Sequence, residues 1–196
     1  MEASNQPQKK TERRIWRISL AITGLLAIGA VVLFWPQIKY EWAYWQLHRH
    51  EAISVVEDSG VLEYGVDFKN ISPTDADYAA LEILKDDIIS LYICVDPKWE
   101  KIPVFPKLGF LVLENSNIDT QLLKQFGTGS IIHYLVIRNC QLDDAASEAL
   151  SDFNELEQLN IDNCDITGAG LSCLKDHPKL KNLSLLDCPV SQEGIE

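Results

Sequence analysis

A single spacing pattern in the second half of the chain constrains its fold most strongly. Leu156-x-x-Leu159-x-Ile161-x-x-Cys164-x-Ile166 recurs at a constant interval of 24 residues, with copies that begin at Leu108, Ile132 and Leu180. One such unit has too little apolar surface to bury its own face, so the units are expected to stack on one another. The ninth position of the four copies holds Ser116, Cys140, Cys164 and Cys188.

The pattern and its period match the leucine-rich repeat, in which each unit is a strand followed by a helical or irregular return. Residues 88–196 are therefore predicted to form an α/β leucine-rich-repeat solenoid with a parallel sheet, whose first strand covers residues 88–95. Alternate strand positions such as Leu159 and Ile161 point inward. The returns are predicted to bury Leu123 with Phe126, Ser147 with Leu150 and Leu171 with Leu174, after helix N-caps at Asp119, Asp143, Thr167 and Ser191.

The cysteines of the repeats allow two interpretations. Free cysteine packs as a small hydrophobic residue, so Cys140, Cys164 and Cys188 are predicted to form a buried ladder of reduced thiols. The alternative is a redox or metal site, because adjacent strands lie about 4.8 Å apart and neighbouring sulfurs approach disulfide range. No CxxC or histidine spacing typical of zinc accompanies them, and Cys94 and Cys173 stand alone. No metal and no cofactor is therefore expected.

An apolar run near the N-terminus is the second organising feature. Residues 18–35 contain no charged side chain and are bracketed by Trp16 and Trp35. The run is long enough to cross a bilayer, so a single transmembrane helix is predicted over residues 15–36, in front of the solenoid. A cleaved signal peptide is the alternative, although the run is longer than a signal peptide's apolar region and lacks a small-x-small cleavage triplet.

Charge asymmetry predicts the orientation of that helix. Five basic residues precede the run, and only Lys39 and Arg49 follow it closely. By the positive-inside rule, residues 1–14 form a basic cytoplasmic tail, the repeats are extracytoplasmic, and the chain is a single-pass protein of the cell membrane. Reduced cysteines are commoner inside cells, which opposes this orientation. The formal net charge of −12 disfavours nucleic-acid binding.

Residues 37–87 are predicted to form a juxtamembrane helix and an N-terminal αβ cap, since terminal repeats need a covering unit. The helix is placed at residues 38–58 and a short strand at residues 61–66. A second helix is expected to begin after Ser72 as its N-cap and to run to about Lys85.

The chain resembles the short, membrane-anchored leucine-rich-repeat proteins of bacteria, especially planctomycetes, over residues 15–35 and 88–196. The best match runs from Leu156 to Leu174 and includes Ile166-Thr167-Gly168-Ala169-Gly170-Leu171. The cysteine-containing repeats of F-box proteins are also similar, but no F-box-like segment precedes these copies. The resemblance implies protein binding.

Signals for catalysis are sparse. No glycine-rich phosphate loop, HExxH or GxSxG motif occurs, and no nucleophile–base pair is evident. His48-Arg49-His50 has the residue types to bind a metal or respond to pH, but a solvated helix face explains it as well. The chain is therefore predicted not to be an enzyme.

The predicted function is protein binding through the concave, exposed face of the sheet. Repeat proteins bind partners on such faces, and aromatic and arginine side chains dominate binding hot spots. Glu114, Arg138 and Asp162 are expected to form a charge ladder there, unless the connection over residues 96–107 covers the face. The predicted contact residues are Tyr92, Phe110, Val112, Glu114, Tyr134, Val136, Arg138, Gln158, Asn160 and Asp162.

The alternative function is that of a structural or assembly subunit in a membrane-associated complex. The last copy of the repeat breaks off at Glu196, which leaves the strand over residues 181–187 as a bare edge. Such an edge can join a partner or a second copy of the chain. A truncated gene product would show the same edge.

Overall fold

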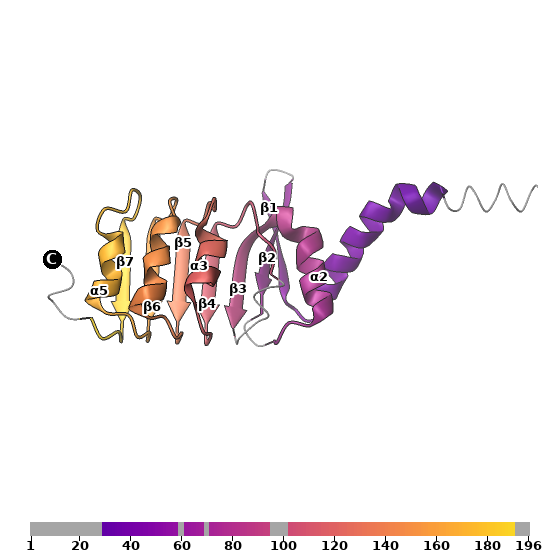
Figure 1. The fold of residues 1–196 in the computed structure, drawn as a ribbon. Helices are drawn as coiled ribbons and strands as arrows, with labels where there is room; N and C mark the ends of the chain where they lie inside the picture. The colour runs from indigo at the N-terminus through magenta and orange to yellow at the C-terminus, as the bar shows by residue number, and fades with distance from the viewer. Residues whose placement is uncertain (1–28, 59–60, 69–70, 95–101, 191–196) are drawn as a thin grey trace, which may run out of the picture. The chain divides into compact units, whose positions relative to one another are not determined.

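The computed structural model describes residues 29–58, 61–68, 71–94 and 102–190. The chain divides into two compact units, residues 1–41 and 42–196, and the second unit contains the sheet. In the described part of the chain, seven strands lie side by side in sequence order (Figure 1). The first two strands are antiparallel and all later neighbours are parallel. The class is therefore α/β with a mostly parallel sheet.

The elements alternate along the chain in the order that a parallel sheet with crossover connections requires. The strands are β1 (Ile53–Asp58), β2 (Val61–Asp67), β3 (Ile88–Cys94), β4 (Phe110–Glu114), β5 (Tyr134–Arg138), β6 (Gln158–Asp162) and β7 (Asn182–Leu186). The helices are α2 (Asp75–Leu84), α3 (Thr120–Gly127), α4 (Asp144–Ser147) and α5 (Gly168–Leu171), with 3-10 turns at Lys85–Asp87, Glu148–Asp152 and Ser172–Leu174.

The 24-residue spacing of the sequence becomes a lateral register in the sheet. Leu111 of β4 pairs with Leu135 of β5, which pairs with Leu159 of β6, and the same step continues to β7. These three leucines are fully buried, as expected for inward positions of period two. The predicted strand register is confirmed.

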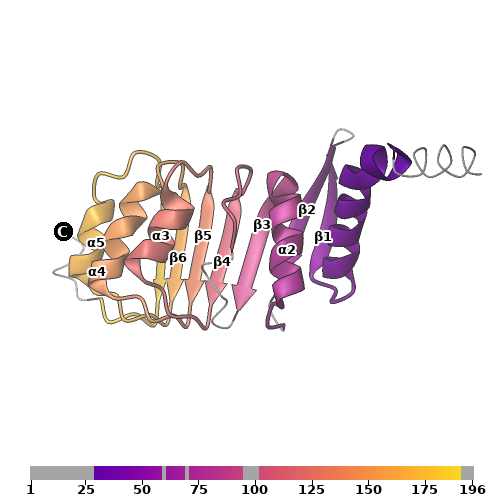
Figure 2. The same cartoon turned by 45° about the vertical axis from the view of Figure 1, so that its right-hand side comes forward.

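The helices of the described return segments cover one face of the sheet. The helices α3, α4 and α5 lie in a row over β4–β7, and α2 lies over the first strands (Figure 2). The side chains of Asp119, Asp143 and Thr167 accept hydrogen bonds from backbone N–H groups of the first turn of α3, α4 and α5, so these three predicted N-caps are confirmed. Ser191 lies outside the described residues. The six predicted return positions are buried, namely Leu123, Phe126, Ser147, Leu150, Leu171 and Leu174.

The residue after each of the strands β4–β7 has a left-handed backbone conformation, which was not predicted from the sequence. Asn115, Asn139, Asn163 and Asp187 have φ angles between 49° and 52°. Asparagine and aspartate tolerate this region because their short polar side chains bond locally. The N–H of each asparagine donates to the last carbonyl of the next strand, as from Asn139 to Asp162 at 2.9 Å. The turns therefore bind successive units together.

The N-terminal cap differs in two respects from its prediction. The helix ends at residue 48, and Ile53–Asp58 forms β1, because the backbone of this segment pairs with β2 and the pairing overrides the weak helical pattern. The N-cap of α2 is Thr74 and not Ser72, because Thr74 and Asp77 form a reciprocal capping box. The predicted strand at residues 61–66 is confirmed as β2.

In the part of the chain that the structure describes, no helix is long and apolar enough to cross a membrane. This finding contradicts the transmembrane helix predicted over residues 15–36, and with it the single-pass membrane placement and its orientation. The helix over residues 29–48 is apolar only as far as Trp35 and then carries Lys39 and Glu41. Of the predicted span, residues 15–28 lie outside the described residues, as does the predicted tail at residues 1–14.

Candidate functional site

The sheet face opposite the helices, here called the open face, is the candidate site. Strand alternation and the observed pairing place all ten predicted contact residues on this face of β3–β6. They form three rows that run across the strands. The first row is Phe110, Tyr134 and Gln158, the second is Tyr92, Val112, Val136 and Asn160, and the third is Glu114, Arg138 and Asp162.

Two stacked aromatic rings stand at the centre of the open face. The rings of Phe110 and Tyr134 are 5.0 Å apart between centroids and 26° from parallel, and Phe110 is 38% exposed. The side-chain amide of Asn160 donates to the Tyr134 hydroxyl oxygen at 2.8 Å. The O–H of Tyr134 therefore remains a donor toward the surface. Such rings provide large contact area with little conformational freedom to lose.

A second tyrosine on the open face is paired with a carboxylate. The hydroxyl of Tyr92 donates to the carboxylate of Glu114 across β3 and β4. Burial, followed by this hydrogen bond, raises the pKa of Tyr92 to about 12. Tyr92 therefore stays protonated at neutral pH and holds Glu114 in place.

Two predicted contact residues are not accessible. Val112 is 3% exposed and Val136 is 4% exposed, although both lie on the open face. Each is flanked along its strand by two larger side chains, Phe110 with Glu114 and Tyr134 with Arg138. The valines therefore form a floor beneath the exposed residues and are not themselves a contact patch.

The predicted charge ladder is confirmed as a row of lateral neighbours, but direct ion pairs do not join its members among the described residues. Glu114, Arg138 and Asp162 are lateral neighbours in the sheet. Among the ion pairs of the described residues, however, none joins Arg138 to either carboxylate. Glu114 is engaged by Tyr92 instead. Arg138 is therefore exposed on the open face, at the opposite end of β5 from Tyr134.

The first row continues through residues that the sequence analysis missed as site residues. Ser54 of β1, Gly65 of β2 and Ser90 of β3 pair in line with Phe110. Together with Asp67, Tyr92 and Phe110 they line a hollow of about 200 Å³ on the open face, here called the serine hollow. The small size of Gly65 and Ser90 is the sequence feature that could have indicated this hollow. Their alignment could not be predicted, because the register between β2 and β3 shifts at Tyr64 and Gly65.

A larger hollow, of about 340 Å³, lies where β4 and β5 end and α3 and α4 begin. Asp119, Asp143 and Asp165 line it, and the first two belong to helix caps, since Asp119 accepts from Leu122 N–H and Asp143 from Ala146 N–H, both at 2.8 Å. Because two of the carboxylates already cap helices, this hollow is a weaker candidate than the open face.

All five cysteines of the described structure are free thiols. Cys140 and Cys164 are buried, as predicted, and burial raises the pKa of Cys140 to about 12 and that of Cys164 to about 11. Cys188, which was predicted to be buried, is partly exposed because no strand lies beyond β7 in the described residues. The cysteine ladder is therefore shielded from solvent only at Cys140 and Cys164.

Alkylation of the native protein should separate these thiols. Iodoacetamide at pH 8 should modify Cys188 within minutes, Cys173 more slowly because burial raises the pKa of its thiol, and leave Cys140 and Cys164 unmodified for hours, because a buried neutral thiol is neither accessible nor ionised. Peptide mass spectrometry at timed intervals measures this order. A control in denaturant should modify all five at similar rates. Rapid native modification of Cys140 would show that the ladder is open.

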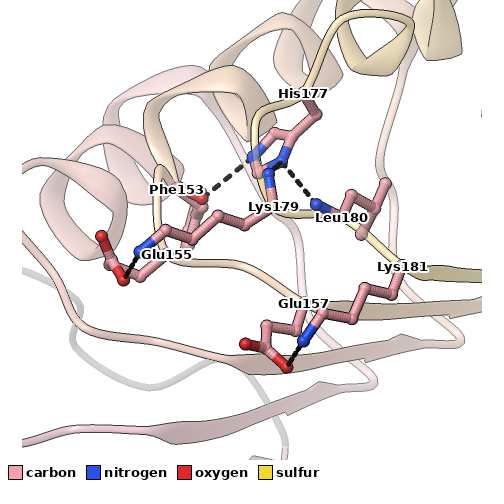
Figure 3. A network of polar contacts seen from close by, with 7 residues as sticks. All are labelled: Phe153, Glu155, Glu157, His177, Lys179, Leu180 and Lys181. Atoms are coloured by element: carbon pink, nitrogen blue, oxygen red, sulfur yellow. Dashed lines mark hydrogen bonds and ion pairs between the residues drawn. The ribbon is translucent and has the colours of Figure 1, made fainter.

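The last described unit is held to its predecessor by three side chains (Figure 3). Lys179 pairs with Glu155, and Lys181 pairs with Glu157 at 2.8 Å. Nδ1 of His177 accepts from Leu180 N–H at 3.2 Å, while Nε2 of the same ring lies 3.0 Å from the Phe153 carbonyl oxygen. The ring is therefore neutral, with its proton on Nε2. These contacts give His177 a structural role between two neighbouring units.

No protein-family model matches this chain, and no curated protein matches it either.

Proposed function

We propose that the chain is a leucine-rich-repeat protein that acts as a non-catalytic protein-binding module through its open face. Support comes from the in-register 24-residue units, from the single-sided covering by helices and from the resemblance of the repeats. Solenoid proteins use such uncovered sheet faces for recognition.

The observation that most supports this proposal is a stacked aromatic pair on the same face as an exposed arginine that forms no ion pair with another described residue. Phe110, Tyr134 and Arg138 are the residue types that dominate protein interfaces, and they share one side of β4 and β5. The described part of the 96–107 connection does not cover them. Its Ile102 carbonyl accepts from the Gln125 side chain of α3 at 2.8 Å, so it packs on the helical side. Residues 96–101 lie outside the described residues.

Affinity capture with the full chain as bait tests the proposal. Tyr134→Ala and Arg138→Glu should each reduce recovery of the specific partner by about tenfold or more, since a hot-spot truncation costs about 2 kcal/mol. Lys124→Glu is the matched charge reversal, on the exposed helical side in α3. Quantitative mass spectrometry of the captured proteins measures the difference. Recovery that both open-face variants leave unchanged would exclude the open face as the binding site.

The alternative proposal is assembly through β7. Leu183 is 42% exposed and Leu186 is 58% exposed, whereas Leu159, at the position of Leu183 in the previous unit, is fully buried. β7 is the outermost strand of the described sheet, and such an edge can pair with another chain. Loss of capture in Leu186→Glu, with full capture in the open-face variants, would favour this alternative.

A further inference from the structure

One histidine ring joins the last two described units, and its hydrogen bonds require the neutral form. Nδ1 of His177 accepts from Leu180 N–H at 3.2 Å and from Lys179 N–H at 3.4 Å. Nε2 of the same ring lies 3.0 Å from the Phe153 carbonyl oxygen in the preceding unit (Figure 3). A second ring proton, on Nδ1, would face two N–H donors and remove both bonds that Nδ1 accepts. This arrangement therefore exists only while the ring carries one proton.

The ring lies at the entry to the outermost strand of the described sheet. Its bond from Leu180 fixes the turn that leads into β7, and its contact with Phe153 fastens that turn to the preceding return. Among the described strands, β7 has one neighbour, β6, whereas β5 has two. An end strand with fewer contacts opens at a lower free energy than a central strand. Loss of the ring contacts should therefore affect β7 first.

The neighbouring ion pairs respond to a different pH range. The hydrogen bond from Lys181 holds the pKa of Glu157 below its ordinary value. Glutamate ordinarily titrates near pH 4.3, so this pair persists between pH 5.5 and 7.5. Histidine is the side chain that ordinarily changes charge in that range.

Charged groups of both signs lie on the segments that meet at the ring. They are Lys175, Asp176, Lys179 and Lys181 on its own side and Asp152, Glu155 and Glu157 on the preceding unit. Lys179 and Lys181 are paired with the two glutamates. Because the acidic and basic groups nearly balance, the hydrogen bonds of the two ring nitrogens decide what a second proton costs.

The direction of the pH dependence follows from the proton count of the two states. When the turn opens, the ring is in water and takes up its second proton near pH 6.5. In the closed state the bonds to Nδ1 exclude that proton. The open state therefore binds more protons below about pH 6.5, and opening becomes more favourable as the pH falls. Above that pH both states carry one ring proton, and the closed state has its full stability.

We propose that His177 is a pH-sensitive switch that holds the last described unit closed at neutral pH and opens it in acid. Protonation of Nδ1 removes the acceptor for Leu180 N–H, frees the turn and releases β7 from β6. The switch lies apart from Phe110 and Tyr134, and it does not depend on which partner binds the open face.

Hydrogen exchange of the full chain, followed by mass spectrometry, tests the switch. After correction for the intrinsic exchange rate, the protection factors of the β7 amides should fall by about tenfold between pH 7.5 and pH 5.5, because one proton is linked to opening. The amides of β5, two strands further in, should keep their protection. Unchanged protection of β7, or an equal fall in β5, would overturn the inference.

Two variants identify the group that titrates. His177→Gln keeps a donor and an acceptor but has no ionisable ring, so the protection of β7 should be nearly the same at both pH values. His133→Gln, at an exposed histidine just before β5, is the matched control and should retain the tenfold fall. A fall in His177→Gln equal to that of the wild type would refute the role of this ring.

A spectroscopic measurement covers the case in which His177→Gln opens β7 at both pH values. The ring ¹⁵N signals of His177 in the wild-type chain should show a proton on Nε2 alone at pH 7.5. They should report the second proton at the same pH at which β7 loses protection. Protonation of the ring while β7 stays protected would overturn the inference.

Discussion

Leu135→Ala should lower the free energy of unfolding by about 3 kcal/mol or more. Leu135 is fully buried on β5, between Leu111 and Leu159 in the same row. Truncation removes apolar contact and leaves a cavity that rigid neighbouring units cannot close, and such changes cost about 2–5 kcal/mol. Urea unfolding followed by circular dichroism measures the loss.

Leu186→Ala is the matched control for that variant. Leu186 is 58% exposed on β7, so the same truncation should change stability by less than about 0.5 kcal/mol. Equal losses in the two variants would mean that Leu186 is covered in solution, by residues 191–196 or by another chain. A small loss in Leu135→Ala would contradict the packed core between the sheet and its helices.

Gly170→Ala should destabilise the protein by about 2–3 kcal/mol. An added Cβ would lie 2.5 Å from Ser147 Oγ and 2.9 Å from Asp144 Cα, so the backbone of two adjacent returns would have to separate. The Asp144 carboxylate accepts from Thr167 N–H at 2.7 Å and from Thr167 Oγ1 at 2.6 Å. These bonds hold the pKa of Asp144 below its ordinary value and would be disturbed as well.

Gly109→Ala provides the comparison with the same chemical change. A Cβ at Gly109 would meet its nearest atom, His133 Nδ1, at 3.8 Å, which is an ordinary contact. Its stability should therefore stay within about 0.5 kcal/mol of the wild type. Thermal unfolding of both variants measures the difference. Similar stability of the two would show that α4 and α5 are not in close contact.

The register of the sheet was predictable because the two-residue period within each strand and the 24-residue period between strands indicate the same set of inward residues. The alternation of Leu159 and Ile161 gives the inward direction, and the 24-residue interval gives the lateral neighbour. The helix caps followed from the same logic, since Asp119, Asp143 and Thr167 each precede a return at the same offset. Each of these inferences needs only local spacing and the rule that units stack.

Other features depended on contacts between segments that are distant in sequence. β1 was predicted as helix because Ile53 and Val56 extend the loose apolar face of the preceding segment, and only its pairing with β2 makes it a strand. The prediction that Val112 and Val136 are accessible contact residues was wrong for a similar reason. Their burial depends on the larger side chains around them and not on which face of the sheet they occupy. The transmembrane prediction used the length, hydropathy and flanking tryptophans of the N-terminal run, whereas the described helix turns polar after Trp35.

The sequence by itself determined the parallel α/β architecture, the lateral rows and the residues of the open face on β3–β6. It could do so because a 24-residue unit that cannot bury its own apolar side must repeat its contacts at that interval. Only the tertiary structure decided that Tyr92 engages Glu114, that Arg138 forms no ion pair with another described residue and that Gly65 leaves room for the hydroxyls of Ser54 and Ser90. Those outcomes depend on side-chain directions and on a register shift between β2 and β3, which no spacing along the chain encodes.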